Sequence, residues 1–314
     1  MSDLRNEFAW SKSKAKLFSD CKRKYWFGTY GKWNGWEAGA DPRAKELYIL
    51  SNLKNRWMWV GDVVHRSVAE ILRAFRDGKD GDPPRVLGSV RNLMTGELSA
   101  SQRKLYRLQG GHKLCALREH EYDERLQDDA WESAIASAEQ CVRNFIDSPL
   151  FAQLKSFPRG NWLAMDEKFQ SFDLNGVKIN LKIDAAHRVP NGGIRIIDWK
   201  AGHSEDELGE LQLAVYALYA VRQWNVLPDR VIVGVCNLKQ SPCGIQEQTP
   251  TAQTLQEAEE TVQDDVRKME NLLRSGRPAN IAEEADYPVT AAPKDCQRCN
   301  FWKACPESPL KGEL

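Results

Sequence analysis

One segment, residues 175–200, reads NGVKINLKIDAAHRVPNGGIRIIDWK and carries the clearest structural signals in the chain. Asn175-Gly176 favours a tight β-hairpin turn, and the apolar residues at positions 177, 179, 181 and 183 alternate as they do in a half-buried strand. A second turn signal at 190–193 leads into an isoleucine-rich run at 194–197. Together with residues 162–174, which alternate loosely, the segment predicts an antiparallel meander of three strands.

Three charged residues fall at the ends of these predicted strands. Asp184 ends the second strand, and Asp198 and Lys200 end the third, where residues two apart face the same side. Two carboxylates at one sheet edge can hold a hard cation such as Mg²⁺ or Mn²⁺, which activates bound water. A lysine beside them can position that water or stabilise a transition state. Because an Asp-x-Lys strand end is more often a surface salt bridge, the assignment needs support from other residues.

Other parts of the sequence supply that support. Gly61 to His65 begins a predicted amphipathic helix, and His65 can provide a nitrogen ligand. Gln212 and Tyr216 lie four apart on a helix predicted over about 207–224, so they share one face. Glu167, on the first predicted strand, is a candidate for a further acid at the site.

The rest of the chain organises around this centre as a single domain over residues 1–314. Residues 11–30 predict a helical opening with Ser11 or Ser13 as N-cap, and 230–236 and 251–275 predict a buried strand and a helix. Residues at about 85–160 are polar and helical in character, which indicates a helical insertion. The segment at about 278–314 is irregular and contains a cysteine cluster.

That cluster has the spacing Cys296-x2-Cys299-x5-Cys305. Three thiolates are one short of a tetrahedral thiolate site or of the usual iron–sulfur ligand shell. Cys21 is the natural fourth ligand, because it lies in a basic, aromatic helix rather than in an apolar stretch. The alternatives for the fourth ligand are Cys115, Cys141, Cys236 and Cys243, and the alternative metal is structural zinc.

The composition is that of a soluble globular protein, and 44 basic residues balance 44 acidic ones, so there is no overall basic excess. Basic residues gather locally from Lys12 to Lys24, where Lys22, Arg23 and Lys24 precede several aromatic residues. Such a pattern suits phosphates and stacked bases, and it suits a core helix equally well. No apolar run is long enough to span a membrane and residues 1–10 lack a signal-peptide core, so we expect a cytoplasmic protein.

Taken in order, these elements resemble the RecB-type nuclease domains of the PD-(D/E)XK superfamily that carry an iron–sulfur cluster. The family includes the AddB nuclease domain and CRISPR-associated exonucleases. The long stretch between His65 and Glu167 departs from the compact CRISPR-type members. The resemblance spans residues 11–306 and rests on Ser11-x-Ser13, Phe18, Cys21-Lys22-Arg23-Lys24-Tyr25, Tyr30, Gly61 to His65, Asp184, Asp198-x-Lys200, Gln212-x3-Tyr216 and the closing cysteines.

The resemblance implies an α/β fold with a central mixed sheet flanked by helices, and a metal-dependent DNA exonuclease acting on single strands or DNA ends. His65, Asp184 and Asp198 would bind Mg²⁺ or Mn²⁺, and Lys200 would serve the hydrolytic water. Gln212 and Tyr216 would contact DNA. A [4Fe-4S] cluster joining the two ends of the chain would be held by Cys21, Cys296, Cys299 and Cys305.

The implied setting is DNA repair, recombination, phage replication or CRISPR adaptation, with a helicase, recombination or CRISPR adaptation protein as a further partner. The sequence contains no Gly-x4-Gly-Lys-[Ser/Thr] loop, so we expect a stand-alone nuclease. The alternative is a non-catalytic DNA-binding or scaffold protein stapled by an iron–sulfur or zinc site. The presence of His65, Asp184, Asp198 and Lys200 favours the enzyme.

Overall fold

The structure is a computed structural model that describes residues 5–79, 81–108, 110–190, 192–202, 209–308 and 310. Its helices are α1 (Lys12–Asp20), α2 (Lys22–Trp26), α3 (Pro42–Ser51), α4 (Arg56–Arg76), α5 (Pro83–Gln102), α6 (Arg118–Glu121), α7 (Ala130–Ile146), α8 (Pro149–Leu154), α9 (Glu210–Gln223), α10 (Ala252–Glu270) and α11 (Pro293–Cys296). Its strands are β1 (Ala9–Trp10), β2 (Trp162–Ala164), β3 (Gln170–Leu174), β4 (Val177–Leu181), β5 (Ala185–Arg188), β6 (Ile194–Lys200), β7 (Val231–Asn237) and β8 (Ile245–Gln248).

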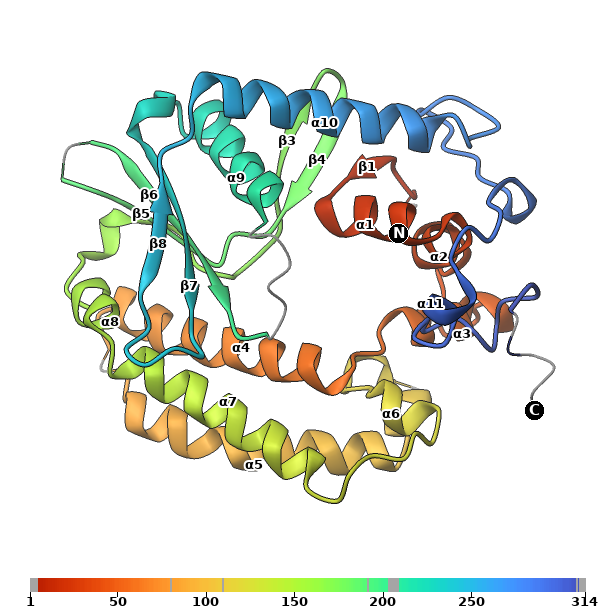
Figure 1. The fold of residues 1–314 in the computed structure, drawn as a ribbon, viewed down its shortest axis with the longest axis horizontal. Helices are drawn as coiled ribbons and strands as arrows, with labels where there is room; N and C mark the ends of the chain where they lie inside the picture. Colours follow the sequence, from red (N-terminus) through yellow and green to blue (C-terminus); the bar gives the residue numbers. More distant parts are fainter. Residues whose placement is uncertain are drawn as a thin grey trace.

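The strands form two sheets (Figure 1). The smaller sheet has the order β1-β4-β3, with β1 parallel and β3 antiparallel to β4. The larger sheet has the order β2-β5-β6-β7-β8, in which β6 and β7 run parallel and the other neighbours run antiparallel. Helices α9 and α10 lie on one side of the larger sheet and α4, α5 and α7 on the other. The predicted α/β fold with mixed strands flanked by helices is confirmed.

The predicted three-stranded meander is wrong, because its strands are divided between the two sheets. Asn175 and Gly176 form the predicted hairpin turn, with φ of 53° and 76°, and join β3 to β4. After β4 the chain leaves this sheet, and β5 pairs with β6 in the other one. The crossing is held at Ile183, whose carbonyl accepts the N–H of Asp166 at 3.1 Å. Apolar alternation runs unbroken through Ile183, so alternation alone does not reveal the change of sheet.

Caps fix where the first long helices begin. Ser11, rather than Ser13, caps α1 by accepting the N–H of Lys14 at 3.3 Å. Helix α4 begins at Arg56, before the predicted start at Gly61, because the side chain of Asn55 accepts the first free N–H groups of the helix. Residues 85–160 are largely helical, and α5 and α7 pack against α4. None of the helices in the described ranges is long and apolar enough to cross a membrane.

The side chains of β6 alternate between two hydrophobic clusters. Ile196 belongs to the cluster that contains the buried face of α9, and Ile197 belongs to the cluster that contains α4 and α7. Residues two apart on a strand share a face. Asp198 and Lys200 therefore share the face of Ile196 and point towards α9.

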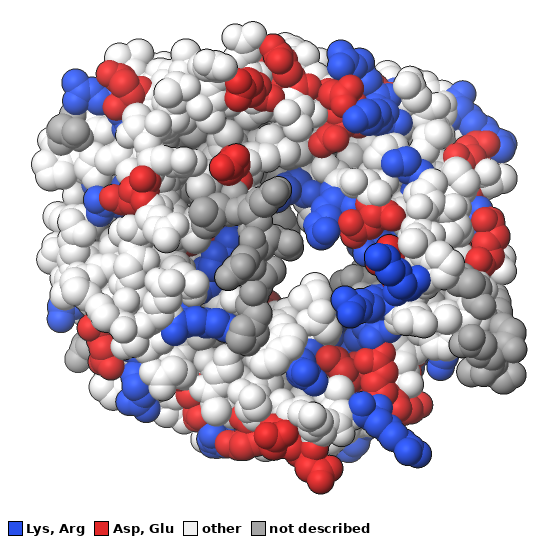
Figure 2. Space-filling view, viewed as in Figure 1, with Lys and Arg blue, Asp and Glu red and all other residues white. Residues whose placement is uncertain are grey.

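The arrangement of these parts leaves an opening in the molecule. In Figure 1 the two sheets lie on one side, and α1, α2 and the C-terminal segment with α11 lie on the other. Helix α10 runs along one edge between them and α4 along the opposite edge. Figure 2 shows the opening in the same view, with Lys and Arg side chains at parts of its rim.

Candidate active site

Asp198 and Lys200 lie at the end of β6, between β5 and β7. The side chain of Asp198 is buried, whereas that of Lys200 is 43% exposed. Lys200 Nζ lies 2.7 Å from Asp198 Oδ2. One end of the strand therefore presents a buried carboxylate next to an amine that reaches solvent.

Asp184 and His65 approach the same place from two other elements. Asp184 lies where the chain crosses between the sheets, and His65 lies on α4. His65 Nδ1 is 3.1 Å from Asp184 Oδ1, and Asp184 Oδ2 accepts the backbone N–H of Trp199 at 2.9 Å. The second bond joins Asp184 to the backbone between Asp198 and Lys200, so the structure brings all four predicted residues together.

The charges of these groups are strongly coupled. Burial disfavours the charged imidazole of His65, but the carboxylates of Asp184, Asp198 and Asp166 outweigh burial and raise the pKa of His65 to about 9. Burial, followed by the charge of Asp184, raises the pKa of Asp198, while Lys200 and His65 oppose that shift. Perturbed groups gathered in one place are typical of functional sites.

The chemistry of the donor set suits a hard divalent cation. Asp198 Oδ2 is buried, and its contact within the described residues is the ion pair with Lys200 Nζ at 2.7 Å. Carboxylate oxygens with one imidazole are suitable ligands for Mg²⁺ or Mn²⁺. As the described side chains stand, no three His, Cys, Asp or Glu residues are close enough to hold a metal ion. His65 and Lys200 instead pair with the two carboxylates.

Gln212 and Tyr216 of α9 contact Asp198 from its other side. Gln212 Nε2 donates to Asp198 Oδ1 at 2.9 Å and to the Tyr216 hydroxyl at 2.6 Å. The Tyr216 hydroxyl donates to the carbonyl of Lys182 at 2.8 Å and lies 3.4 Å from Asp198 Oδ1. Tyr216 is only 3% exposed. Its contacts in this structure therefore orient Asp198 rather than face the solvent where DNA would lie.

The further acid at the site is Asp166, not the predicted Glu167. The Asp166 carboxylate is buried, pairs with Lys182, and acts through its charge on His65. Glu167 is 42% exposed and pairs with Arg76 at 2.6 Å. Asp166 has a φ of 46°, so the backbone departs from the extended conformation of a strand at this residue. As a result Asp166, rather than Glu167, points inward. The signal in the sequence was a pair of adjacent acids, Asp166 and Glu167, before a strand. Strand alternation favours Glu167, and that choice is wrong.

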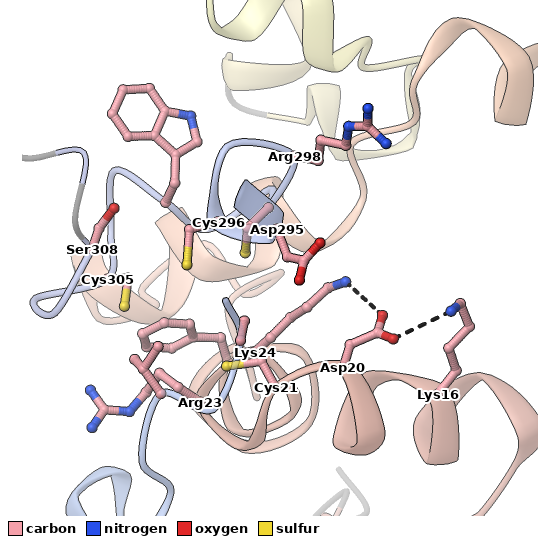
Figure 3. A pocket seen from close by; sticks show the side chains of 15 residues that line it. Lys16, Asp20, Cys21, Arg23, Lys24, Asp295, Cys296, Arg298, Cys305 and Ser308 are labelled. Atoms are coloured by element: carbon pink, nitrogen blue, oxygen red, sulfur yellow. Dashed lines mark hydrogen bonds and ion pairs between the residues drawn. The ribbon is translucent and has the colours of Figure 1, made fainter. Parts of the chain in front are cut away.

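The four cysteines predicted as cluster ligands lie around one pocket, and no three of their thiols are close enough, as the described residues stand, to hold a metal ion. One pocket of about 350 Å³ is lined by Cys21, Cys296, Cys299 and Cys305, and Figure 3 shows Cys21, Cys296 and Cys305 facing it from the start of α2 and the C-terminal segment. The other cysteines lie elsewhere, in or against the core below the larger sheet: Cys115, Cys141, Cys236 and Cys243. Of the candidates for the fourth thiol, the structure therefore places Cys21 beside the other three.

The thiols of this pocket differ in their surroundings. Cys21 lies at the break between α1 and α2, where burial disfavours its thiolate. Backbone hydrogen bonds, those from Lys24 and Thr290 foremost, outweigh burial and lower the pKa of Cys21. For the three C-terminal cysteines burial dominates and raises the pKa. Cys21 is therefore the thiol that the backbone best prepares to carry a negative charge.

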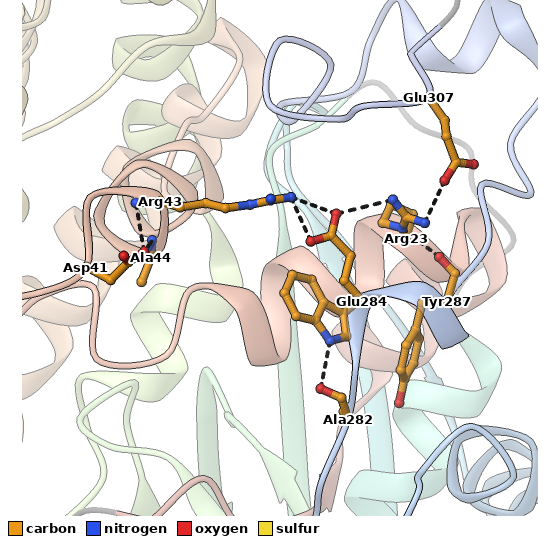
Figure 4. A network of polar contacts seen from close by, with 9 residues as sticks. Arg23, Asp41, Arg43, Ala44, Ala282, Glu284, Tyr287 and Glu307 are labelled. Atoms are coloured by element: carbon orange, nitrogen blue, oxygen red, sulfur yellow. Dashed lines mark hydrogen bonds and ion pairs between the residues drawn. The ribbon is translucent and has the colours of Figure 1, made fainter.

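Arg23 joins the N-terminal helices to the C-terminal segment (Figure 4). Its buried side chain donates to the carbonyl of Tyr287 at 2.7 Å and pairs with Glu284 at 3.2 Å and Glu307 at 2.7 Å. Arg43 of α3 reaches the same Glu284 at 2.7 Å. Arg23 does not fit the predicted DNA-binding patch, because its guanidinium is fully engaged inside the protein.

The two neighbouring lysines are half-buried and also have internal partners. Lys22 Nζ donates to the carbonyl of Phe18 at 2.9 Å and lies over the Phe18 ring. Lys24 Nζ pairs at 3.1 Å with Asp20, which Lys16 also contacts (Figure 3). The basic run at 12–24 therefore presents less free charge to a nucleic acid than its sequence indicates.

We predict that Arg23→Met lowers the free energy of unfolding by about 2 kcal/mol, because it breaks a buried ion pair whose partners are partly exposed. The matched control is Lys22→Met, which removes a charge from the adjacent position but leaves these ion pairs intact. Urea unfolding of both variants measures the difference. Equal stability of the two variants would show that the Arg23 contacts do not hold the chain ends together.

Two carboxylates and a lysine at one end of a mixed sheet are an arrangement suited to metal-assisted hydrolysis. The chain belongs to the PD-(D/E)XK nuclease superfamily, whose family model matches residues 9–306. This membership supports nuclease activity as the function of the chain.

The solved structures that are similar to the chain include two that cover more than half of it. A candidate exonuclease from Eubacterium rectale shares 16% sequence identity at a TM-score of 0.43, over 84% of this chain and 80% of that one. The structure of SSO0001 shares 19% identity at a TM-score of 0.31, over 60% of this chain and 79% of that one. A search of the curated proteins gave no match.

Proposed function

We propose that the chain is a metal-dependent nuclease that hydrolyses DNA phosphodiester bonds, and that it acts as an exonuclease on single-stranded DNA or DNA ends. One observation carries the proposal. Asp184 and Asp198 are buried, are linked through the Trp199 N–H, and lie with His65 and Lys200 at one strand end. Superfamily membership agrees with this chemistry.

In this proposal His65, Asp184 and Asp198 hold Mg²⁺ or Mn²⁺. The cation, when bound, lowers the pKa of a water molecule and neutralises charge on the phosphate. Lys200 positions the attacking water and stabilises the negative charge that develops in the transition state. Its 43% exposure beside buried Asp198 supports this role, because the amine can reach both the substrate and the carboxylate.

Gln212 and Tyr216 act mainly through Asp198 in this proposal. Their contacts engage Asp198 Oδ1, while Oδ2 faces Lys200. The Asp198 carboxylate is therefore held in one orientation. Gln212 also accepts a hydrogen bond from Lys12 Nζ at 3.3 Å and is half-buried, so its amide is the better placed of the two to meet DNA.

We further propose that a [4Fe-4S] cluster is bound by Cys21, Cys296, Cys299 and Cys305. Four thiolates are the usual ligand shell of such a cluster, and these four cysteines line one pocket. The cluster would join α2 to the C-terminal segment beside the Arg23 contacts and so act as a staple. Zinc bound by the same thiols is the alternative that metal analysis and the colour of the protein distinguish.

The biological setting follows from the same proposal. We infer a single nuclease domain over residues 1–314, with a helical insertion at about 85–160 and a cluster-binding segment at about 278–314, working in the cytoplasm. The Lys and Arg side chains at the rim of the opening suit contact with phosphates (Figure 2). DNA repair, recombination, phage replication and CRISPR adaptation are the pathways that use such an enzyme, each with a helicase or other DNA-processing partner.

The proposal is tested by incubating the purified protein with end-labelled single-stranded and duplex DNA. We expect cleavage with Mg²⁺ or Mn²⁺, none after removal of divalent cations with a chelator, and recovery when Mn²⁺ is returned. The length of the products distinguishes cutting from an end from internal cutting. DNA binding without cleavage under any of these cations would instead favour a non-catalytic DNA-binding or scaffold protein.

A further inference from the structure

The loop that carries Asp166 also carries the most exposed large apolar side chain among the described residues. Phe169 is 75% exposed. Single exposed apolar side chains are common on protein surfaces, so it is the place of Phe169 beside the candidate active site, rather than its exposure alone, that points to a ligand.

Strand register places Phe169 next to the catalytic end of the fold. Gln170 pairs with Leu181 in the antiparallel β3–β4 hairpin, so Phe169 falls opposite Lys182. Lys182 is two residues from Asp184, and its carbonyl accepts the Tyr216 hydroxyl that contacts Asp198. The register therefore places Phe169 opposite a residue whose carbonyl holds Tyr216 and which lies two positions before Asp184.

The loop is fixed on both sides of the ring. The Asp166 N–H bonds the carbonyl of Ile183 at 3.1 Å, and the side-chain oxygen of Gln170 accepts the Ile183 N–H at 3.3 Å. Glu167 pairs with Arg76 of α4 at 2.6 Å. The backbone on both sides of Phe169 is thus held in place, which lowers the backbone entropy lost when a ligand packs on the ring.

We propose that Phe169 stacks on an unpaired base of the DNA strand that is cut. The site then accepts only nucleotides whose bases are not already stacked on a neighbouring base. This inference rests on the proposed function and deepens it. Every base has a π-face, and exposed aromatic rings flanked by lysines are the usual platform for single strands. Lys168 next to the ring is exposed, so a cation is available to an adjacent phosphate. Within a duplex the base faces are already stacked, which restricts the substrate to single strands and frayed ends.

The test pairs variants of the ring with changes in the base. Affinity and kcat/KM are measured for wild type, Phe169→Ala and Phe169→Trp on a single-stranded oligonucleotide and on the same oligonucleotide carrying a run of abasic sites at its end. We expect Phe169→Ala to weaken binding to the normal strand about tenfold and Phe169→Trp to retain it. On the abasic strand, wild type and Phe169→Ala should be equal, because no base remains to stack.

The matched control is Leu227→Ala. Leu227 is 68% exposed and precedes β7, at the end of the parallel strands opposite to Asp198. The Leu227→Ala variant should bind both oligonucleotides with the wild-type affinity. Equal losses for Phe169→Ala on normal and abasic strands, or no loss on either, would overturn the stacking role. Absence of cleavage by wild type would defeat the proposed function, and the binding comparison would still decide the role of the ring.

Discussion

Replacing Lys200 with alanine is expected to slow DNA cleavage by about a hundredfold or more, with little change in DNA affinity. The amine lies 2.7 Å from the buried Asp198 carboxylate and reaches solvent, so its charge acts where the reacting phosphate would lie. A charge used mainly in the transition state affects kcat rather than binding. Asp198→Ala should abolish cleavage as well, because it removes a ligand of the proposed cation.

Lys178→Ala is the matched control for Lys200→Ala. Lys178 is 51% exposed and pairs with a carboxylate, that of Glu7 at 3.3 Å, but it lies at the far end of β4 from Asp184. The Lys178→Ala variant should cleave DNA at the wild-type rate. Single-turnover rates and melting temperatures of both variants separate catalysis from folding. Cleavage by Lys200→Ala at the wild-type rate would mean that the active site lies elsewhere.

Replacing Cys21 with alanine is expected to remove iron from the protein and to lower its thermal stability. Cys21 and the other three thiols lie near opposite ends of the chain, so a cluster between them closes nearly the whole chain into one loop. A cross-link of this span contributes about 4–5 kcal/mol in the chain-entropy account, against a total stability of about 5–15 kcal/mol for typical domains. The Arg23 contacts also join these segments, so we expect partial rather than complete unfolding.

Iron content, melting temperature and nuclease rate of Cys21→Ala are to be measured together. Cys115→Ala is the control, since Cys115 is a half-buried thiol outside the pocket and should keep full iron. A full cluster in Cys21→Ala would show that another residue is the fourth ligand. Loss of iron and activity with an unchanged melting temperature would contradict the staple and indicate that the cluster acts directly on DNA or catalysis.

The sequence indicated that Asp198 and Lys200 share one strand face, whereas it did not indicate how the strands divide between two sheets. Asp198 and Lys200 could be placed because side-chain direction along a strand depends only on local spacing. Asp184 follows the alternating run of residues 177–183, but that run continues past the end of β4 at Leu181, so alternation did not mark where the chain leaves the sheet. The partition of the meander into two sheets depends on which strands pair, and residues far away in the chain determine that pairing.

The errors at single residues have the same origin. Arg23 looks like part of a basic surface because its partners Glu284 and Glu307 are distant in sequence. Asp166 could not be preferred to Glu167, because the positive φ that turns it inward is set by its bond to Ile183. Burial and ion pairing of charged residues are tertiary properties, and local patterns carry little information about them.

The pairing of β1 with β4 has a consequence for biosynthesis. Residues 9–10 leave the ribosome well before their partners at 178–179, and Arg23 leaves it well before its partners Glu284 and Glu307. Contacts of such long sequence separation form slowly. Until those partners are synthesised, the Arg23 guanidinium lacks its native ion pairs and the Cys21 thiol lacks the other three cysteines of the pocket. The native contacts of residues 9–10 and of Arg23 therefore cannot form until their much later partners have been made.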